Sequence, residues 1–172
     1  PLEQMWGKKK FIFYYLSAGF GAVLIQTIFY HYDVNLVTKL LSENGLSNAD
    51  INSFFDTGRL NTSIIQLVGE ERLYSGFQSY KAVMVGASGA LYGILVGFAM
   101  LFPNVQLMLL FPPIPIKAKV LVPLLILFDL FFGFTSYSVG PIAHFAHIGG
   151  AVTGFIMMWY WKKNQFNDRR WN

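Results

Sequence analysis

The sequence predicts an all-α fold, a helical bundle that crosses a membrane several times. Hydrophobic residues make up 54% of the 172 residues and charged residues only 13%, which is too apolar for an ordinary soluble domain of this length. Four apolar stretches are long enough to cross about 30 Å of hydrocarbon as helices that rise about 1.5 Å per residue. They cover residues 11–30, 82–102, 118–137 and 141–161. We therefore predict one polytopic membrane domain over residues 1–172.

The connection between the second and third spans differs in composition from the spans themselves. Residues 103–116 include apolar side chains, but Pro112, Pro113 and Pro115 interrupt them. Because proline removes a backbone donor and clashes with the preceding helical turn, this segment is predicted to be a loop at the membrane interface.

The distribution of Lys and Arg predicts the orientation of the spans. Nine of the thirteen basic residues precede the first span, connect the second to the third, or follow the fourth: Lys8, Lys9, Lys10, Lys117, Lys119, Lys162, Lys163, Arg169 and Arg170. The positive-inside rule then places both ends of the chain in the cytoplasm and the segment 31–81 outside. We expect a multi-pass protein of a bacterial cytoplasmic membrane.

The outer segment 31–81 is predicted to form short amphipathic helices on the membrane surface. Asp33 would cap a first helix that ends at Gly45, Ser47 a second helix, and Asn61 or Thr62 a third. Two roles remain open for this segment, a lid that shields the outer face and a gate that captures substrate.

Composition also excludes several classes of function. The sequence has no cysteine, so it contains no disulfide, thiolate metal site or cysteine nucleophile. The net charge is +4, but the basic residues flank apolar stretches and do not line a polar face with stacking aromatic residues. We expect no nucleic-acid partner.

Ser88 and His147 are the strongest candidates for chemistry. Each lies about six residues inside its span, and the second and fourth spans run in the same direction, so helical geometry predicts a common depth about 9 Å below the outer boundary. A serine hydroxyl becomes a good nucleophile when a neutral imidazole accepts its proton. Tyr92, one turn below Ser88, is placed to pack against such an imidazole.

A purely structural interpretation competes with this one. Small residues spaced four apart also favour close contact between membrane helices, and Ser88 would then be one small residue among others. Such residues are Gly86, Ala90, Gly93 and Gly97 in the second span and Gly150 and Gly154 in the fourth. Since a histidine inside a membrane is costly, its match in depth with Ser88 favours the catalytic interpretation.

Three other polar residues allow further hypotheses. His144 and His147 are spaced to share a helix face, but no His-Glu-x-x-His pattern or evident third ligand accompanies them, so no metal is predicted. Asp129 lies among Leu and Phe and would serve either in a proton relay or in a hydrogen bond between helices. His31 borders the outer segment and is interpreted as an interfacial residue.

The two motifs together resemble those of rhomboid intramembrane serine proteases. The matching residues are Gly86-Ala87-Ser88-Gly89 and, after one intervening span, Ala146-His147-Ile148-Gly149-Gly150 with Gly154. The opening Leu2-Glu3-Gln4-Met5-Trp6-Gly7 is similar to the junction before the third helix of that family. The chain would then correspond to the last four helices of a six-helix core, and the family residues on the first two helices would have no counterpart in this sequence.

The resemblance implies a serine endopeptidase that cuts transmembrane protein substrates within the lipid bilayer, through an acyl-enzyme and without a cofactor. Ser88 would be the nucleophile and His147 the general base, with the Tyr92 ring against the imidazole. The oxyanion hole would use the backbone at Ser88 and Ala87, left uncrowded by Gly86 and Gly89, while Gly150 supports the histidine helix.

Two alternatives from other classes remain. A catalytically inactive relative would keep the fold and bind membrane proteins without cutting them, although such relatives typically lack the serine or the histidine. A transporter subunit would need a continuous polar pathway, which Ser88, His147, His144 and Asp129 do not form in an obvious way.

Overall fold

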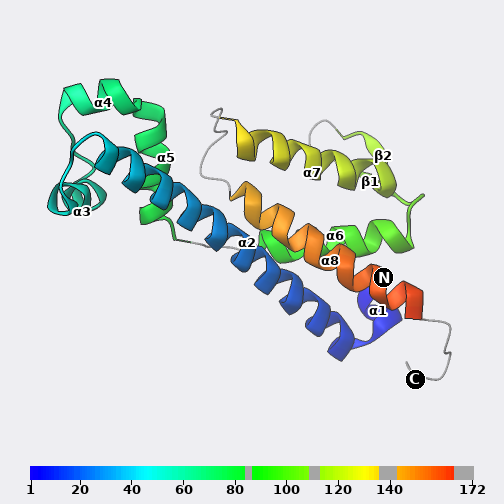
Figure 1. Cartoon of the computed structure of the whole chain (residues 1–172). Helices are drawn as coiled ribbons and strands as arrows, with labels where there is room; N and C mark the ends of the chain where they lie inside the picture. Colours follow the sequence, from blue (N-terminus) through cyan, green and yellow to red (C-terminus); the bar gives the residue numbers. More distant parts are fainter. Residues whose placement is uncertain (84–86, 109–112, 136–142, 165–172) are drawn as a thin grey trace. The chain divides into compact units, whose positions relative to one another are not determined.

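The structure is a computed structural model, and it describes residues 1–83, 87–108, 113–135 and 143–164. Its elements, in chain order, are α1 (Leu2–Trp6), α2 (Lys8–Glu43), α3 (Asn48–Thr57), α4 (Thr62–Val68), α5 (Glu70–Lys81), α6 (Ser88–Leu101), β1 (Gln106–Met108), β2 (Pro115–Lys117), α7 (Ala118–Phe134) and α8 (His144–Asn164) (Figure 1). The predicted all-α class is confirmed. The chain divides into two compact units, Pro1–Gln26 with Gly86–Asn172, and Thr27–Val85.

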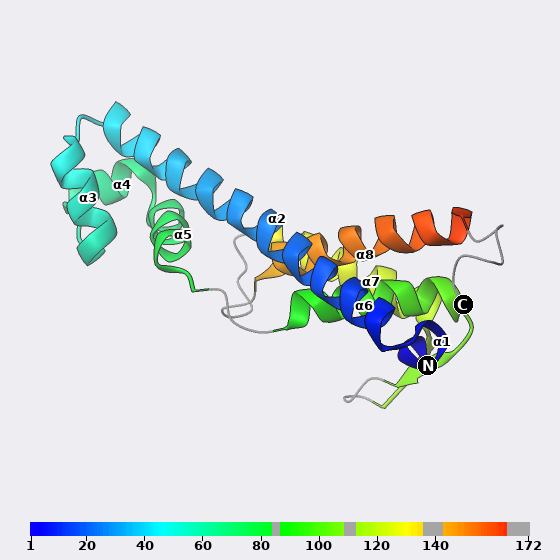
Figure 2. The same cartoon turned by 90° about the horizontal axis from the view of Figure 1, so that it is seen from below.

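The first unit is built on close approach of helix backbones. A Cβ atom at Gly150 of α8 would overlap the carbonyl oxygen of Gly89 of α6, and one at Gly154 would lie 2.7 Å from the Cα atom of Gly93. These contacts confirm that small residues allow α6 and α8 to meet. Helix α7 lies beside α8 (Figures 1 and 2), and its Val122 joins Val96 of α6 and Ala151 of α8 in a buried cluster.

Tyr14 connects the N-terminal part of α2 to α6 and α8. The side chain is fully buried, and its hydroxyl lies 3.0 Å from the carbonyl oxygen of Gly93 and 2.8 Å from that of Gly154. Its ring packs against Trp6 and Trp161, with ring centroids 5.0 and 5.4 Å away. The Lys10 ammonium lies 4.4 Å from the Trp161 ring centroid, which closes the cluster with a cation–π contact.

The second unit has a core of larger side chains. Six buried residues from α2, α3 and α5 form it: Val37, Leu41, Ile51, Phe54, Phe55 and Leu73. The predicted cap at Ser47 is confirmed, because its hydroxyl accepts from the Asp50 N–H at the start of α3 while the Asp50 carboxylate accepts from the Ser47 backbone. Asn61 precedes α4 as predicted, without a side-chain capping bond.

One predicted boundary in this unit is wrong. Asp33 does not cap a helix, because α2 continues without a break from Lys8 to Glu43. The Asp33 carboxylate instead accepts a hydrogen bond from the Ser79 hydroxyl of α5, at 2.9 Å. Helix α5, which contributes Leu73 to the core, was not predicted from the sequence.

The connection between α6 and α7 contains a small hairpin. Strands β1 and β2 pair antiparallel, with Gln106 opposite Lys117 and Met108 opposite Pro115. The connection is non-helical over its described residues, as predicted, but it contains two short strands. The prolines in the sequence do not indicate that these strands pair. Pro112 lies outside the described residues.

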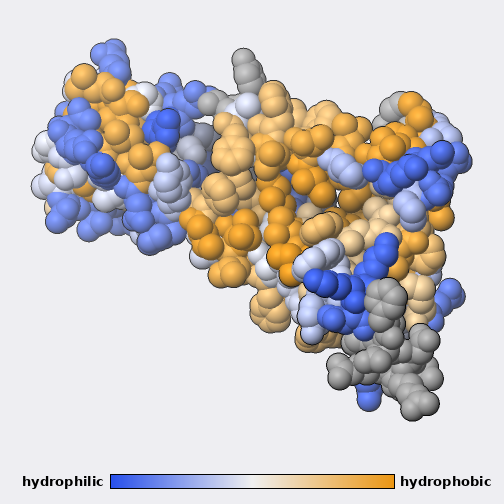
Figure 3. All heavy atoms as spheres, turned by 45° about the vertical axis from the view of Figure 1, so that its right-hand side comes forward, coloured by the Kyte–Doolittle hydropathy of each residue, from blue (hydrophilic) through white to orange (hydrophobic). Residues whose placement is uncertain are grey.

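Exposed apolar side chains cover much of the first unit. On α7 they include Leu124, Leu127, Phe128, Phe131 and Phe134, and Figure 3 shows hydrophobic residues gathered in a broad area. Such an area on a water-soluble monomer would be unusual, and it suits contact with lipid. Among the described residues only α2 is both long and apolar enough to cross a membrane by itself, while α6 is a shorter apolar helix. That the segments 82–102, 118–137 and 141–161 cross a membrane stays a prediction.

Candidate active site

Ser88 is the first residue of helix α6. The predicted helix over 82–87 is wrong for the described residues, because Ala82 and Val83 are not helical and Ala87 forms the N-cap. Apolar composition continues across this boundary, so it hides the helix start. Ser88 and Ala87 are exposed, whereas Gly89 is buried. The hydroxyl is therefore accessible, and the N–H groups of this first turn have no acceptor within the helix. Gly86 lies outside the described residues.

His147 also lies in a first helical turn. Helix α8 begins at His144, so the prediction that His147 is six residues inside a helix is wrong: His147 is the fourth residue of α8, whereas Ser88 is the first residue of α6. The imidazole is mostly buried, with 13% of its side chain exposed. Its ring stacks on Tyr92 of α6, with centroids 4.2 Å apart and planes 6° from parallel.

The Tyr92 stack relates the histidine to the serine. Ser88 and Tyr92 are four residues apart on α6, so their side chains share one helix face. The backbones of the two helices also meet beside this face, because a Cβ atom at Gly89 would lie 3.0 Å from the carbonyl oxygen of Ala146. The structure therefore brings the helix turns of Ser88 and His147 together, with Tyr92, Gly89 and Gly150 between them.

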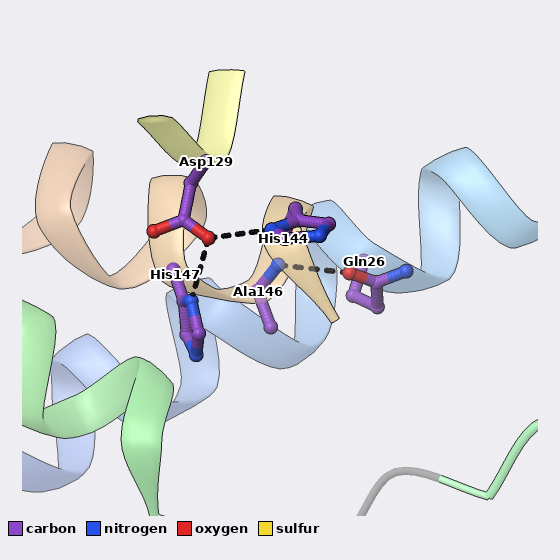
Figure 4. A network of polar contacts seen from close by, with 5 residues as sticks. All are labelled: Gln26, Asp129, His144, Ala146 and His147. Carbon is purple, nitrogen blue, oxygen red and sulfur yellow. Dashed lines mark hydrogen bonds and ion pairs between the residues drawn. The ribbon is translucent and has the colours of Figure 1, made fainter. Parts of the chain in front are cut away.

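Asp129 of α7 joins the site through both histidines. Its Oδ1 atom lies 2.7 Å from His144 Nδ1 and 2.9 Å from His147 Nδ1 (Figure 4). The Tyr92 side chain also interacts with this carboxylate. Asp129 is only 5% exposed, so these contacts supply the polar partners that a buried carboxylate needs. The sequence predicted a proton relay or a hydrogen bond between helices at Asp129, but it did not indicate the contact with His147.

The two histidines face different neighbours. His144 lies beside Phe132 of α7, with ring centroids 6.0 Å apart, whereas His147 lies against Tyr92 on the helix that begins with Ser88. The Nε2 atom of His144 is buried and has no hydrogen-bond partner in the described part of the chain. This difference favours His147 as the base.

Gln26 of α2 supports the turn that carries His147. Its Oε1 atom accepts a hydrogen bond of 2.8 Å from the Ala146 N–H, one of the backbone donors at the start of α8 (Figure 4). Gln26 is 3% exposed. Gln26 was not among the residues predicted from the sequence, although a glutamine within an apolar helix could have indicated it.

Comparison with known proteins decides the family. The family model described as the Rhomboid domain matches residues 55–164, which is more than half of the chain. The chain belongs to the rhomboid family. No match was found among curated proteins or among solved structures. The predicted membership is confirmed, and it makes this a membrane protein from a family that is generally composed of serine proteases.

The family match contains both candidate catalytic residues. Ser88, Tyr92, Asp129 and His147 all fall within 55–164, while Gln26 and the opening Leu2–Trp6 helix precede it. In this rhomboid chain an exposed serine begins the helix whose Tyr92 stacks on the His147 imidazole, and the Nδ1 atom of that imidazole meets a carboxylate. That combination is chemically suited to nucleophilic attack with general-base assistance.

Helix α7 presents a shallow apolar recess next to this network. Leu127, Phe128, Phe131 and Phe132 line a volume of about 260 Å³. Phe132 both lines the recess and lies against His144, so the recess adjoins the polar site.

Proposed function

We propose that this rhomboid chain is an intramembrane serine endopeptidase with Ser88 as nucleophile and His147 as general base. The observation that supports it most is the parallel stack of His147 on Tyr92, one turn from Ser88 on the same helix. Stacking holds the imidazole plane, and the Asp129 contact occupies Nδ1, so Nε2 is the nitrogen available to the serine.

The proposed reaction has two stages. In the first, the Ser88 hydroxyl oxygen attacks the carbonyl carbon of the peptide bond and passes its proton to His147 Nε2. The C–N bond then breaks, the imidazolium returns that proton to the departing amine, and an ester to Ser88 remains. In the second stage, His147 takes a proton from water, the hydroxide equivalent attacks the ester, and the Ser88 oxygen leaves with the proton from His147.

Negative charge on the carbonyl oxygen needs donors during both stages. The backbone N–H groups at Ser88 and Ala87 are proposed to supply them, at the start of α6 where the helix dipole also favours negative charge. Loss of one such donor typically costs about 3 kcal/mol of transition-state stabilisation. Ala87 and Ser88 are exposed, which leaves space for a substrate carbonyl.

The proposed substrates are transmembrane segments of other proteins. The recess on α7 supports this substrate class, because its exposed apolar residues suit a polypeptide that comes from lipid. If the phenyl rings restrict entry, Phe131→Ala will raise the cleavage rate of a transmembrane substrate without changing labelling by a small serine-directed probe. An unchanged cleavage rate in a folded Phe131→Ala protein would argue against entry beside this ring.

Labelling with a fluorophosphonate probe tests the catalytic assignment. The full-length protein in detergent or liposomes should be labelled, and Ser88→Ala and His147→Ala should each abolish labelling. Ser63→Ala and His31→Ala change an exposed serine and an exposed histidine elsewhere and should keep it. Absence of labelling in folded wild-type protein would instead favour an inactive family member that binds membrane proteins.

A further inference from the structure

Asp129 makes a contact that a serine–histidine pair by itself does not require. The carboxylate belongs to α7, which carries neither Ser88 nor His147, and it meets the side of the imidazole away from the proposed proton transfer. Both histidines approach the same oxygen through the same ring atom, Nδ1. An ionised carboxylate only accepts hydrogen bonds, so each Nδ1 that bonds to it must carry the proton.

We propose that Asp129 is a positioning residue for His147, and that His144 holds the carboxylate in place. The inference rests on the proposed function, because it assigns a role in the same reaction. With the proton fixed on Nδ1 of His147, the lone pair is fixed on Nε2, where it can accept the Ser88 proton. An imidazole without this partner exchanges between two tautomers, of which only one is a base toward Ser88.

The charge of Asp129 has a second effect during the reaction. When Nε2 accepts the serine proton, the imidazole becomes a cation whose Nδ1 lies 2.9 Å from the carboxylate oxygen. Asp129 is buried, and attraction between opposite charges is stronger where water is excluded. The carboxylate therefore stabilises the charged form of His147 at the stage when the tetrahedral intermediate exists.

His144 completes the arrangement from the other side of the carboxylate. A carboxylate oxygen has two lone pairs, so Oδ1 can accept from both histidines at once. His144 is itself held against Phe132, and its Nε2 atom has no hydrogen-bond partner among the described residues. Among the described residues, the polar contact of the His144 side chain is therefore the one to Asp129. This contact holds Asp129 Oδ1 in the position where it meets His147 Nδ1.

The alternative is that Asp129 only fastens α7 to α8. Asp129→Asn separates the two roles, because the amide oxygen can still accept a hydrogen bond but the negative charge is gone. We expect Asp129→Asn to unfold at nearly the wild-type temperature while kcat and the probe-labelling rate fall about 100-fold, within the range of general-base effects. KM for a transmembrane substrate should change much less than kcat. Asp33→Asn, which alters a carboxylate bonded to the Ser79 hydroxyl, is the matched control and should leave the rates unchanged.

His144 variants test the second part of the proposal. His144→Leu removes the donor and should lower the labelling rate, while His144→Asn supplies an N–H donor and should recover part of it. Equal rates in both variants, at equal thermal stability, would overturn the role of His144.

Nitrogen-15 NMR of histidine-labelled wild-type protein tests the tautomer without any change to Asp129. The proposal requires the neutral His147 ring to carry its proton on Nδ1, with the resonances assigned from the His31→Ala and His144→Asn spectra. A proton on Nε2 would overturn the proposal even if Asp129→Asn failed to fold.

Failure of this inference differs from failure of the proposed function. Wild-type labelling that disappears in Ser88→Ala and His147→Ala but persists within twofold in folded Asp129→Asn would overturn only the positioning role. If the labelling rate of Asp129→Asn fell only because the variant was thermally less stable, the positioning role would also be overturned. No labelling of wild-type protein would overturn the protease assignment itself.

Discussion

In the first unit, helices α6 and α8 touch through the backbone at Gly89, Gly93, Gly150 and Gly154, whereas in the second unit side chains such as Leu41 and Phe54 fill the space between helices. Many apolar side chains of the first unit point outward. Between helices in lipid the hydrophobic effect contributes little, so close packing and hydrogen bonds hold them together. We expect burial of apolar surface from water to contribute more to helix packing in the second unit, because its segment 31–81 is predicted to lie outside the membrane.

The largest expected effect is at the backbone contact between α6 and α8. Gly150→Ala places a methyl group on the carbonyl oxygen of Gly89, so the helices must separate. We expect a loss of about 3 kcal/mol or more of stability, at the upper end of overpacking effects, together with loss of probe labelling. Gly19→Ala is the control, because its Cβ would meet only the Ala90 side chain at 3.5 Å. Thermal unfolding in detergent that is equal for both variants would contradict the role of backbone contact.

The core of the second unit should respond to loss of volume. Leu41 is fully buried, so Leu41→Ala leaves a cavity and should cost about 2–5 kcal/mol. Hydrogen exchange of amides in α3 and α5 would measure this locally. Leu67→Ala removes a side chain that is 70% exposed and should change exchange little. If both variants exchanged alike, burial would not be what stabilises this unit.

A smaller effect is expected from the hydroxyl of Tyr14. Tyr14→Phe keeps the ring contacts with Trp6 and Trp161 but removes the hydrogen bonding to the carbonyl oxygens of Gly93 and Gly154. Loss of a typical hydrogen bond costs about 1 kcal/mol. Chemical denaturation should show this decrease, and Tyr15→Phe, a change of the neighbouring half-buried tyrosine, serves for comparison. A Tyr14→Phe protein as stable as wild type would mean that ring packing alone joins α2 to α6 and α8.

The smallest effect depends on pH and belongs to the water-exposed cap of α3. Hydrogen bonds from the Ser47 hydroxyl and backbone hold the pKa of Asp50 below its ordinary value. The stabilisation is therefore complete at neutral pH and is lost on acidification, as the pH falls through the lowered pKa of Asp50. Asp50→Asn should be less stable than wild type at pH 7, and the difference should shrink on acidification. A difference that did not depend on pH would show that the carboxylate charge contributes nothing.

The parts of the fold that local patterns determine were predictable. The Ser47 cap needs only residues three positions apart, and its prediction was confirmed. Asp33 has an equally suitable type for a cap, but it bonds to Ser79, which is 46 residues away, and α2 continues past it. Whether such a residue caps a helix depends on tertiary contacts that its neighbours in sequence do not reveal.

The same distinction applies to the site. The spacing of Ser88 and Tyr92 on one helix indicated the face on which the Tyr92–His147 stack occurs. The start of α6 at Ser88 was not predictable, because no capping side chain marks it and the preceding residues are equally apolar. The contact of Asp129 with both histidines depends on how α7 lies along α8, and hydrophobic composition does not define that register.

The aromatic cluster near the N-terminus has a spectroscopic consequence. The ring centroids of Trp6 and Trp161 lie 5.4 Å apart, beside the Lys10 ammonium, although the two residues are 155 positions apart in sequence. Indole emission is sensitive to nearby charge and to exposure to water, so separation of α8 from α1 and α2 should change the fluorescence of both residues together. Trp161 and His147 belong to the same helix, α8. The intrinsic tryptophan fluorescence of the protein therefore reports whether the helix that carries the proposed base is packed against α1 and α2.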